Sequence, residues 1–515
     1  MKLKQLFQAV REASFIGDVE VELSGLEFDS RRVTPGQIFF AINGYRQDGH
    51  RFIQDALGRG ALAVVSESTP AQGPGTHTAA WVQVPNARRA LALAASEFYG
   101  HPSEQMQLVG VTGTNGKTTV SFLIASILDA ARKKPALFGT IEYRLIFGEA
   151  DYRTPAPNTT PESLDLQRML RQVVDGGGQS AVMEVSSHAL ALDRVAGCSF
   201  HTAAWTNFSR DHLDFHAGVE DYFAAKAKLF LATGENVAPQ LAVLNADDPR
   251  CSSIAEQTPA RILRFGIEQP ADVSARKWKT TRSGTSLTAQ TPSGPIELES
   301  PLVGRHNVYN LLAAAAAAIA LEATPEQIQQ GVQNLRVPGR METVEEAQPF
   351  RVYVDYAHTE DALKNLVASA RELDRNGDLI IVFGCGGDRD RSKRPLMGLA
   401  AAACDRVILT SDNPRSEDPL QVINDVTVGL QKASANYVIE PDRKAAIERA
   451  LAEARAGDTV LIAGKGHERY QIVEDTQIPF DDRETAHAAL RQMGYGQESG
   501  VGSQDSEEGL ASRRQ

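Results

Sequence analysis

Residues 107–130 constrain what this chain can fold into more than any other stretch. An apolar run at 107–111 predicts a buried strand, and apolar residues recur at helical spacing over 118–130. The turn between them, Gly-Thr-Asn-Gly-Lys at 113–117, is of the kind that cradles phosphate. In such turns backbone N–H groups and the helix N-terminus face the anion, a lysine adds positive charge, and a threonine hydroxyl can bind Mg²⁺.

This turn departs from the usual phosphate-loop pattern at one position, because Val111 stands where the first glycine is expected. A glycine-rich turn that merely begins a helix is the alternative, and the flanking strand and helix make it the weaker one. The sequence therefore predicts a nucleotide phosphate site formed by Gly113, Thr114, Asn115, Gly116, Lys117, Thr118 and Thr119.

The bulk composition argues against several classes of protein. A chain of 515 residues favours about three domains, and a formal net charge of −12 disfavours a general binder of nucleic acid or anionic membranes. The four cysteines are scattered, offer no close pair for a metal site and suit a reducing compartment. Residues 1–14 lack the apolar core of a signal peptide, and the longest apolar run, 311–321, is too short to span a bilayer. We therefore expect a soluble, cytoplasmic protein. We also expect a monomer that acts on small molecules, although composition itself does not supply this.

Strand and helix patterns alternate along most of the chain, which predicts an α/β fold with mostly parallel sheets. We expect a first domain at 1–100, a central domain that contains the phosphate loop at 101–336, a C-terminal domain at 337–496 and a disordered tail at 497–515. The central domain is predicted to be of the phosphate-loop type with a mostly parallel sheet, and the C-terminal one to be doubly wound and Rossmann-like. Within the central domain, the pattern at 271–303 predicts a small antiparallel excursion, and an alanine-rich helix is predicted after Asn310.

Ligands of open parallel sheets bind beyond the carboxyl ends of the strands, so the residues that follow each strand matter most. Glu184 follows a predicted strand and could hold Mg²⁺ opposite the phosphate loop, with a capping or solvated glutamate as the alternative. His212 lies in Ser-Arg-Asp-His-Leu-Asp at 209–214, where two aspartates favour a metal or phosphate role over that of a surface histidine.

Two other segments of the central domain admit two interpretations each. Thr160 is expected to cap a helix that has a proline in its first turn, whereas the hydroxyl of Thr159 could contact a substrate. A helix predicted over 220–231 carries Lys226 and Lys228, and each lysine taken alone is most simply a solvated side chain.

The C-terminal domain supplies three cationic loops after predicted strands, at 384–394, 412–415 and 464–468. The first fails the dinucleotide fingerprint, because Arg389 occupies the position of the third glycine. An arginine at a strand end suits bidentate capture of a carboxylate, and Glu468 could hold an ammonium group. Any one loop could be a solvated charge cluster, but three at one sheet edge favour a binding site.

Six motifs, taken together and in order, resemble those of the Mur ligase family. They are Thr-Gly-Thr-Asn-Gly-Lys-Thr-Thr (112–119), Glu-Val-Ser-Ser-His (184–188), Ser-Arg-Asp-His-Leu-Asp (209–214), Gly-Arg-His-Asn-Val-Tyr-Asn (304–310), Gly-Arg-Met-Glu (339–342) and Asp-Tyr-Ala-His (355–358). The resemblance runs from Asp29 to Glu468. It implies an amide-forming ligase of peptidoglycan precursor synthesis, with ATP and Mg²⁺ as cofactors and separate domains for a UDP-linked substrate, for ATP and for an amino acid.

The resemblance also implies roles for individual residues. Around ATP it implies Asn307, Asn310, Arg340, Asp355 and His358, and in catalysis Lys117, His212 and Lys226. Mg²⁺ would be served by Thr118, Glu184, His212 and Lys226, which matches the carbamylated lysine of the family. Because of this match, Lys226 is no longer interpreted as a solvated side chain. Lys228 is still interpreted as one. Contacts to the UDP-linked substrate are implied for Ser30, Gly44, Tyr45, Arg46, Asn158, Thr159, Thr160, Ser186 and Arg194, although Tyr45 and Arg46 replace a His-Gln pair found in some members.

The amino acid is implied by Asp-Asn-Pro-Arg at 412–415, which in this family accompanies meso-diaminopimelate joined to UDP-N-acetylmuramoyl-L-alanyl-D-glutamate through an acyl phosphate. The implied contacts are Arg389, Asp412, Asn413, Pro414, Arg415, Gly464 and Glu468. The chemistry agrees, because diaminopimelate has a carboxylate that lysine lacks and that arginines can pair with. Two rivals remain: a relative that adds lysine or acts on folate, and a phosphate-loop ATPase that binds or regulates without ligation.

Overall fold

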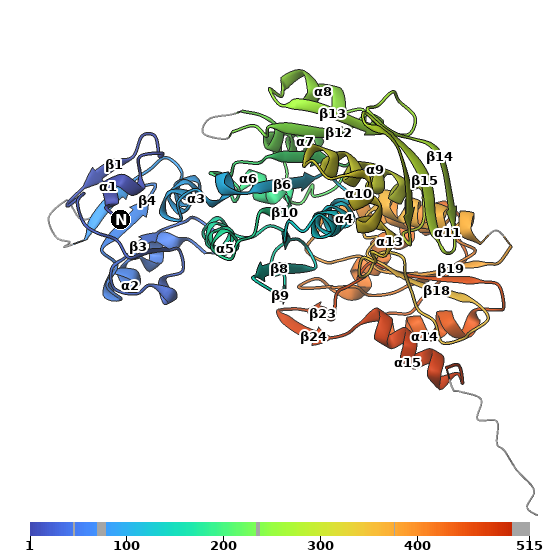
Figure 1. The fold of residues 1–515 in the computed structure, drawn as a ribbon. Helices are drawn as coiled ribbons and strands as arrows, with labels where there is room; N and C mark the ends of the chain where they lie inside the picture. The colour runs from blue at the N-terminus through green and yellow to red at the C-terminus, as the bar shows by residue number, and fades with distance from the viewer. Residues whose placement is uncertain (45–46, 69–78, 233–236, 375, 497–515) are drawn as a thin grey trace, which may run out of the picture.

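Three large sheets follow one another along the chain in this computed structural model, which describes residues 1–44, 47–68, 79–232, 237–374 and 376–496 (Figure 1). The predicted contacts Tyr45 and Arg46 and the predicted disordered tail at 497–515 lie outside the described residues. No helix in the described ranges is long and apolar enough to cross a membrane.

The first sheet has five strands in the order β1-β5-β4-β3-β2, all parallel except β1. Its elements are α1 (Leu3–Leu6), β1 (Ser14–Ile16), β2 (Gly25–Glu27), β3 (Gln37–Phe40), α2 (Ile53–Gly58), β4 (Ala63–Ser66), β5 (Ala80–Gln83) and α3 (Ala87–Phe98). The side chain of Asn86 caps α3, which buries its alanine and leucine residues against this sheet. Helix α3 also contacts α5 (Ser163–Asp175) of the next domain, as Figure 1 shows.

The central sheet has eleven strands in the order β16-β15-β14-β13-β12-β11-β6-β10-β7-β8-β9. Its strands are β6 (Gln107–Thr112), β7 (Ala136–Phe138), β8 (Glu142–Phe147), β9 (Ala150–Pro155), β10 (Ser180–Glu184), β11 (Thr202–Trp205), β12 (Leu241–Asn245), β13 (Arg261–Gly266), β14 (Val273–Thr281), β15 (Gly284–Thr291) and β16 (Gly294–Ser300). Its helices are α4 (Lys117–Ala130), α5 (Ser163–Asp175), α6 (Ser187–Ala191), α7 (Val219–Ala227), α8 (Cys251–Gln257), α9 (Arg305–Ala320) and α10 (Pro325–Gln333).

The predicted phosphate strand, β6, lies in the parallel middle of this sheet between β10 and β11. Helices α4, α9 and α10 pack together on one face, where their apolar residues form a core with those of the strands. The predicted antiparallel excursion is confirmed as β14, β15 and β16, which continue the same sheet beyond β13. The central position of β6 brings the turn after it to the ligand-binding edge of the sheet.

Two local predictions in this domain are wrong. Helix α9 begins at Arg305 and not after Asn310, because its polar first turns face a cavity and so lack the apolar pattern of the core. Thr160 does not cap a helix: α5 begins at Ser163, and the Thr160 hydroxyl donates to the carbonyl of Glu184 at 2.8 Å. A tertiary contact at the end of β10 therefore replaces the expected local one.

The third sheet has the order β17-β18-β22-β19-β20-β21, parallel except for β17 at one edge. Its elements are β17 (Glu342–Thr343), β18 (Arg351–Asp355), α11 (Glu360–Leu373), β19 (Leu379–Phe383), α12 (Arg394–Ala401), β20 (Arg406–Leu409), α13 (Pro419–Lys432), β21 (Tyr437–Ile439), α14 (Arg443–Glu453), β22 (Thr459–Ala463), the hairpin of β23 (Tyr470–Val473) and β24 (Thr476–Pro479), and α15 (Asp482–Gln492). Helices α11, α12 and α13 cover one face and α14 and α15 the other, which confirms the doubly wound prediction.

Candidate active site

A cavity of about 780 Å³ lies between the central and C-terminal domains, at the carboxyl ends of β6, β10, β11 and β18. Most of the predicted site residues line it: Thr114, Asn115, Gly116, Lys117, Thr118, Thr119, Asn158, Thr159, Glu184, Ser186, Arg194, His212, Lys226, Asn307, Asn310, Arg340, Asp355, His358 and Arg389. Other predicted residues are absent from the described lining: Ser30, Gly44, Gly113, Thr160, Asp412, Asn413, Pro414, Arg415, Gly464 and Glu468.

The phosphate loop is a tight turn that only glycine permits at two positions. Gly113 and Gly116 have φ of 142° and 85°, and a Cβ on Gly113 would lie 1.9 Å from Thr206 Oγ1. Lys117 Nζ folds back to donate to the carbonyls of Gly113 and Thr114, at 3.0 and 2.9 Å. Gly116, Lys117 and Thr118 line the cavity, so the start of α4 and the lysine amine adjoin the same space.

Lys226 brings a second amine to the same carbonyl. It projects from α7, donates to Gly113 O at 2.8 Å, and its side chain is 1% exposed. Burial, and the charge of Lys117 nearby, hold the pKa of Lys226 well below that of a free lysine. An amine kept neutral in this way is nucleophilic, which carbamylation by CO₂ requires.

Side-chain oxygens that could bind a metal ion lie opposite the loop, around Glu184. This residue is fully buried at the end of β10. Its carboxylate accepts from Thr118 Oγ1 at 3.0 Å and from the backbone N–H of Thr140 at 2.8 Å. Arg340 in turn donates to Thr118 Oγ1 at 3.1 Å. Hydroxyl and carboxylate oxygens are hard ligands that suit Mg²⁺. In the described part of the chain, no three His, Cys, Asp or Glu side chains group closely enough to hold a metal ion by themselves.

His212 lies across the loop in a left-handed backbone conformation, with φ of 54°. Its ring packs edge-on against His188, with centroids 4.8 Å apart, and its Nε2 lies 3.5 Å from Asp211. Burial lowers the pKa of His212, so that its imidazole stays neutral despite that carboxylate. A neutral imidazole is the form that binds a metal ion or donates to phosphate.

The residues implied for the UDP-linked substrate lie in two places. Thr159 reaches the cavity, where its hydroxyl lies 3.1 Å from that of Thr140. Arg194 is held by an ion pair with Glu162 at 2.6 Å and by the carbonyl of Thr160 at 3.1 Å. Ser30 and Gly44 belong to the first domain, near the ends of β2 and β3, and lie outside this cavity.

The residues implied for the nucleotide line the cavity from α9 and from the segments next to β18. The side-chain amide of Asn310 donates to Asn307 Oδ1 at 2.9 Å within α9, and its Oδ1 would lie 2.5 Å from a Cβ on Gly116. The carboxylate of Asp355 accepts from two backbone N–H groups, whereas His358 Nδ1 bonds to the carbonyl of Tyr356 at 2.9 Å. Helix α9 and the end of β18 thus meet the phosphate loop from two domains.

Of the diaminopimelate residues, only Arg389 lines the cavity. Arg415 is half-buried beside it and donates to the carbonyl of Gly387 at 2.9 Å. Glu468 accepts from Asn413 at 3.0 Å and from the fully buried Lys465 at 2.9 Å. The three cationic loops therefore meet, as their positions after parallel strands predict.

Three residues of the site were not singled out from the sequence. Thr140 joins Glu184 to Thr159, Asp361 accepts from Asn115 of the phosphate loop at 2.8 Å, and Lys393 pairs with Asp211 at 3.4 Å. Asp361 acts across the domain boundary, where local patterns carry no signal, whereas Lys393 belongs to the cationic loop at 384–394 but was not assigned a role of its own. Thr140 follows β7, so its place after a strand could have indicated it.

The fold and this site define a phosphate-loop enzyme whose cavity also contains an arginine from the central domain, Arg194, and one from the C-terminal domain, Arg389. Three profiles match the chain: the Mur ligase family, catalytic domain at 22–99, the Mur ligase middle domain at 111–318, and the Mur ligase, glutamate ligase domain at 339–466. The chain belongs to the Mur ligase family and is an ATP-dependent ligase.

Individual relatives agree over nearly the whole length. The UDP-N-acetylmuramoyl-L-alanyl-D-glutamate–2,6-diaminopimelate ligase of Solibacter usitatus is 51% identical over 480 residues, which cover 93% of this chain and 95% of that protein. A solved ligase of the same name has a TM-score of 0.67 and 32% identity, and covers 96% of this chain and 99% of that chain. A MurF ligase from Thermotoga maritima, solved with ADP, shares the fold at a TM-score of 0.59 and 19% identity, over 92% and 97% of the two chains.

Proposed function

We propose that this ligase joins meso-2,6-diaminopimelate to UDP-N-acetylmuramoyl-L-alanyl-D-glutamate in peptidoglycan precursor synthesis, and converts ATP to ADP and phosphate. The observation that carries the proposal is a single cavity shared by the phosphate loop, Arg194 and Arg389. Its walls come from two domains, so a nucleotide, an acceptor carboxylate and an incoming amine can meet there. The names of the relatives support the identity of the substrates.

The reaction proceeds in two displacements. A carboxylate oxygen of the D-glutamate end attacks the γ-phosphorus of ATP, the bond to the β–γ bridging oxygen breaks, and an acyl phosphate and ADP form. The neutral amine of diaminopimelate then attacks the acyl carbon, phosphate leaves with the bonding electrons, and the nitrogen loses a proton. Lys117 and Arg194 line the same cavity. In this proposal Lys117 neutralises the transferring phosphoryl group and Arg194 holds the acceptor.

The site fits Mg²⁺, because the Thr118 hydroxyl and the Glu184 carboxylate are adjacent hard donors and His212 is held neutral beside them. Carbamylation of Lys226 would convert its cationic ammonium group into an anionic carbamate, whose oxygens can bind Mg²⁺. Mg²⁺ bound by these four residues would supply charge neutralisation for the phosphate oxygens.

The remaining parts of the chain have matching roles in this proposal. The domain at 1–100 holds the UDP part through Ser30 and Gly44, the domain at 101–336 holds ATP, and the domain at 337–496 admits the amino acid. We also propose that the chain works as a monomer. ATP and nucleotide-linked sugars are cytoplasmic metabolites, so we place the protein in the cytoplasm.

A phosphate-release assay tests the function. We expect phosphate only when ATP, the UDP-linked dipeptide and diaminopimelate are all present, with lysine a far poorer substitute. Phosphate release without either substrate would favour an ATPase that only binds or regulates, and equal rates with lysine would favour a lysine-adding relative.

A further inference from the structure

Two arginines of the C-terminal domain rest on the backbone of one short turn. Arg415 Nη1 donates to the carbonyl of Gly387 at 2.9 Å, and Arg389 Nη1 donates to the carbonyl of Asp388 at 3.0 Å. Neither guanidinium makes an ion pair with a carboxylate of the described residues. Both charges are therefore available to a ligand, and their positions depend on where the turn lies.

The turn itself approaches the second loop very closely. Gly387 N–H donates to the carbonyl of Asn413 at 2.9 Å, and a Cβ on Gly387 would lie 1.8 Å from the carbonyl oxygen of Pro414. A Cβ on Gly386 would lie 3.0 Å from Arg415 Nη1. Any movement of this backbone would therefore displace Arg415 directly.

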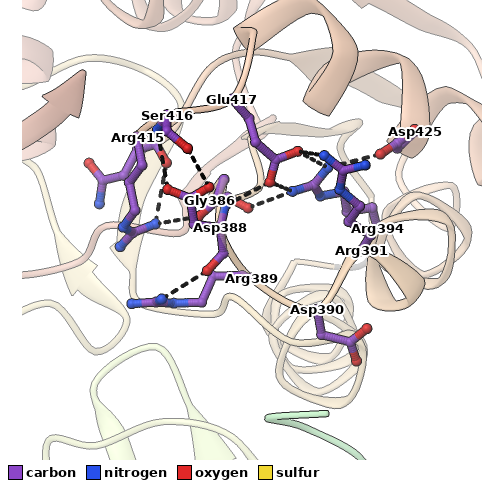
Figure 2. A network of polar contacts seen from close by, with 12 residues as sticks. Gly386, Asp388, Arg389, Asp390, Arg391, Arg394, Arg415, Ser416, Glu417 and Asp425 are labelled. Carbon is purple, nitrogen blue, oxygen red and sulfur yellow. Dashed lines mark hydrogen bonds and ion pairs between the residues drawn. The ribbon is translucent and has the colours of Figure 1, made fainter. Parts of the chain in front are cut away.

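Arg394 and Glu417 both bond to the backbone of that turn (Figure 2). Arg394 Nη2 donates to the carbonyl of Gly386 at 3.2 Å, and Glu417 accepts from the N–H of Asp388 at 2.7 Å. The two side chains also pair with each other in a bidentate arrangement, at 2.7 and 3.1 Å. The residue between the two held positions is Gly387, on which Arg415 rests.

The charges of this pair are satisfied within the network and do not reach the two free arginines. Glu417 also accepts from Arg391 at 2.6 Å, and Arg394 also donates to Asp425 at 2.9 Å. The Arg394 side chain is 1% exposed and that of Glu417 10%. Hydrogen bonds from Arg394 lower the pKa of Glu417 to about 2, so the pair stays ionised at neutral pH.

We propose that Glu417 and Arg394 are positioning residues for the amino-acid substrate: they fix the 386–388 backbone on which Arg389 and Arg415 rest. They touch no substrate themselves. The preference for a substrate with a second carboxylate then depends on them as well as on the arginines that bind it. This inference rests on the proposed function, because diaminopimelate is the ligand with that carboxylate.

The test is Glu417→Gln, which keeps the shape of the side chain and removes its charge. We expect the KM for diaminopimelate to rise about tenfold and kcat to stay within about threefold, because a displaced binding group weakens ground-state binding. The KM values for ATP and the UDP-linked dipeptide should not change. The ratio of kcat/KM for diaminopimelate to that for lysine should fall by about the same factor.

Two controls separate positioning from general stability. Asp425→Asn removes one ion pair of Arg394 but keeps both contacts to the turn, so its kinetics should equal those of the wild type. Glu453→Gln removes a glutamate that pairs with Arg406 and Arg449 in the same domain, far along the chain from both loops, and should also be neutral. Should Glu417→Gln fail to fold, Ser416→Ala removes the 2.7 Å hydrogen bond to Asp388 and should raise the same KM about threefold.

An unchanged diaminopimelate KM in Glu417→Gln, or in Ser416→Ala if that variant is needed, would overturn the inference. So would a KM rise of equal size in Asp425→Asn and Glu453→Gln. A wild-type protein that releases no phosphate with diaminopimelate would instead contradict the proposed function, so the two failures are distinguishable.

Discussion

Burial changes the protonation of single side chains in this site. Lys226 shares the carbonyl of Gly113 with Lys117, and two ammonium groups so close together would repel each other. Burial resolves this conflict by lowering the pKa of both, that of Lys226 well below its ordinary value. The neutral amine that results can react with CO₂ at a pH where an exposed lysine is charged.

Lys226→Ala should lower kcat by about 100-fold or more, because a lost anionic ligand near the phosphoryl group removes several kcal/mol of charge stabilisation. Small carboxylates should restore part of the activity. Wild-type activity should fall in CO₂-depleted buffer, recover with bicarbonate, and fall further as the pH drops and the amine becomes protonated. Wild-type kcat in Lys226→Ala would exclude the role proposed for it.

Arg415→Ala should raise the KM for diaminopimelate by about 30-fold or more, since losing one partner of a buried charge pair costs roughly 2 kcal/mol or more. The preference over lysine should narrow by the same factor. Arg469→Ala is the matched control. The Arg469 side chain is 76% exposed and its ion pair with Asp481 is loose, at 3.6 Å, so the KM for diaminopimelate should not change. An unaltered preference in Arg415→Ala would remove Arg415 from substrate selection.

Buried histidines should make stability depend on pH. The rings of His358 and His467 pack on Tyr356, and burial lowers the pKa of His358 to about 4 and that of His467 to about 3. Below pH 6.5 the unfolded chain therefore binds protons that the folded chain does not, and stability falls as the pH falls. We expect urea midpoints to decrease between pH 7 and pH 5, less so in His467→Asn; equal midpoints would contradict this.

At the scale of elements, helices are placed by close backbone contacts as much as by apolar faces. Helices α12 and α13 approach through two glycines: a Cβ on Gly398 would lie 2.3 Å from the carbonyl oxygen of Val426, and one on Gly429 would lie 1.8 Å from that of Pro395. Because α12 begins at Arg394, this contact also places the network that holds the 386–388 turn.

Gly429→Ala should destabilise the C-terminal domain by about 1–3 kcal/mol, because the added methyl group cannot fit without moving α12. Chemical denaturation followed by circular dichroism measures this loss. Gly58→Ala is the matched control: Gly58 also lies in a helix, α2, but a Cβ there would meet open space, so stability should stay equal or rise. Equal stability of Gly429→Ala and wild type would show that α12 and α13 can move apart without loss of stability.

At the scale of the whole molecule, the site depends on contacts between domains. Asn115 bonds to Asp361, Arg340 to Thr118 and Lys393 to Asp211, each pair joining the central domain to the C-terminal one. Farther from the cavity, Arg282 in the turn between β14 and β15 pairs with Asp374 at the end of α11. The antiparallel strands thus carry the central sheet to a second contact with the C-terminal domain (Figure 1).

Arg282→Ala should loosen the contact between the central and C-terminal domains without unfolding either domain. Asp374 keeps Arg351 at 2.9 Å and Thr459 at 3.1 Å, so no buried charge is left alone. Because the Arg282 side chain is 56% exposed, the pair is worth no more than about 1 kcal/mol, or roughly a fivefold shift towards open forms. Small-angle scattering should show a larger radius of gyration that returns to the wild-type value with ATP; an unchanged radius would contradict a tether.

Much of the fold could be predicted because it follows from local sequence patterns. The apolar strand before Gly113, the helical spacing after it and the alternation of strands and helices come from periods of two and 3.6 residues that survive in any tertiary setting. The start of α9 and the role of Thr160 could not be predicted, because a polar turn facing a cavity and a hydroxyl bonded to Glu184 are decided by distant neighbours.

The sequence by itself determined that a phosphate loop follows a buried strand, that two further α/β units flank it, and that arginines follow the strands of the last one. Only the tertiary structure decided that Lys226 is buried against Gly113, that Glu417 and Arg394 hold the turn under Arg415, and that Arg389 enters the cavity of the phosphate loop. The physical reason is that burial, pKa and charge pairing depend on contacts between residues far apart in the chain, which no local pattern encodes.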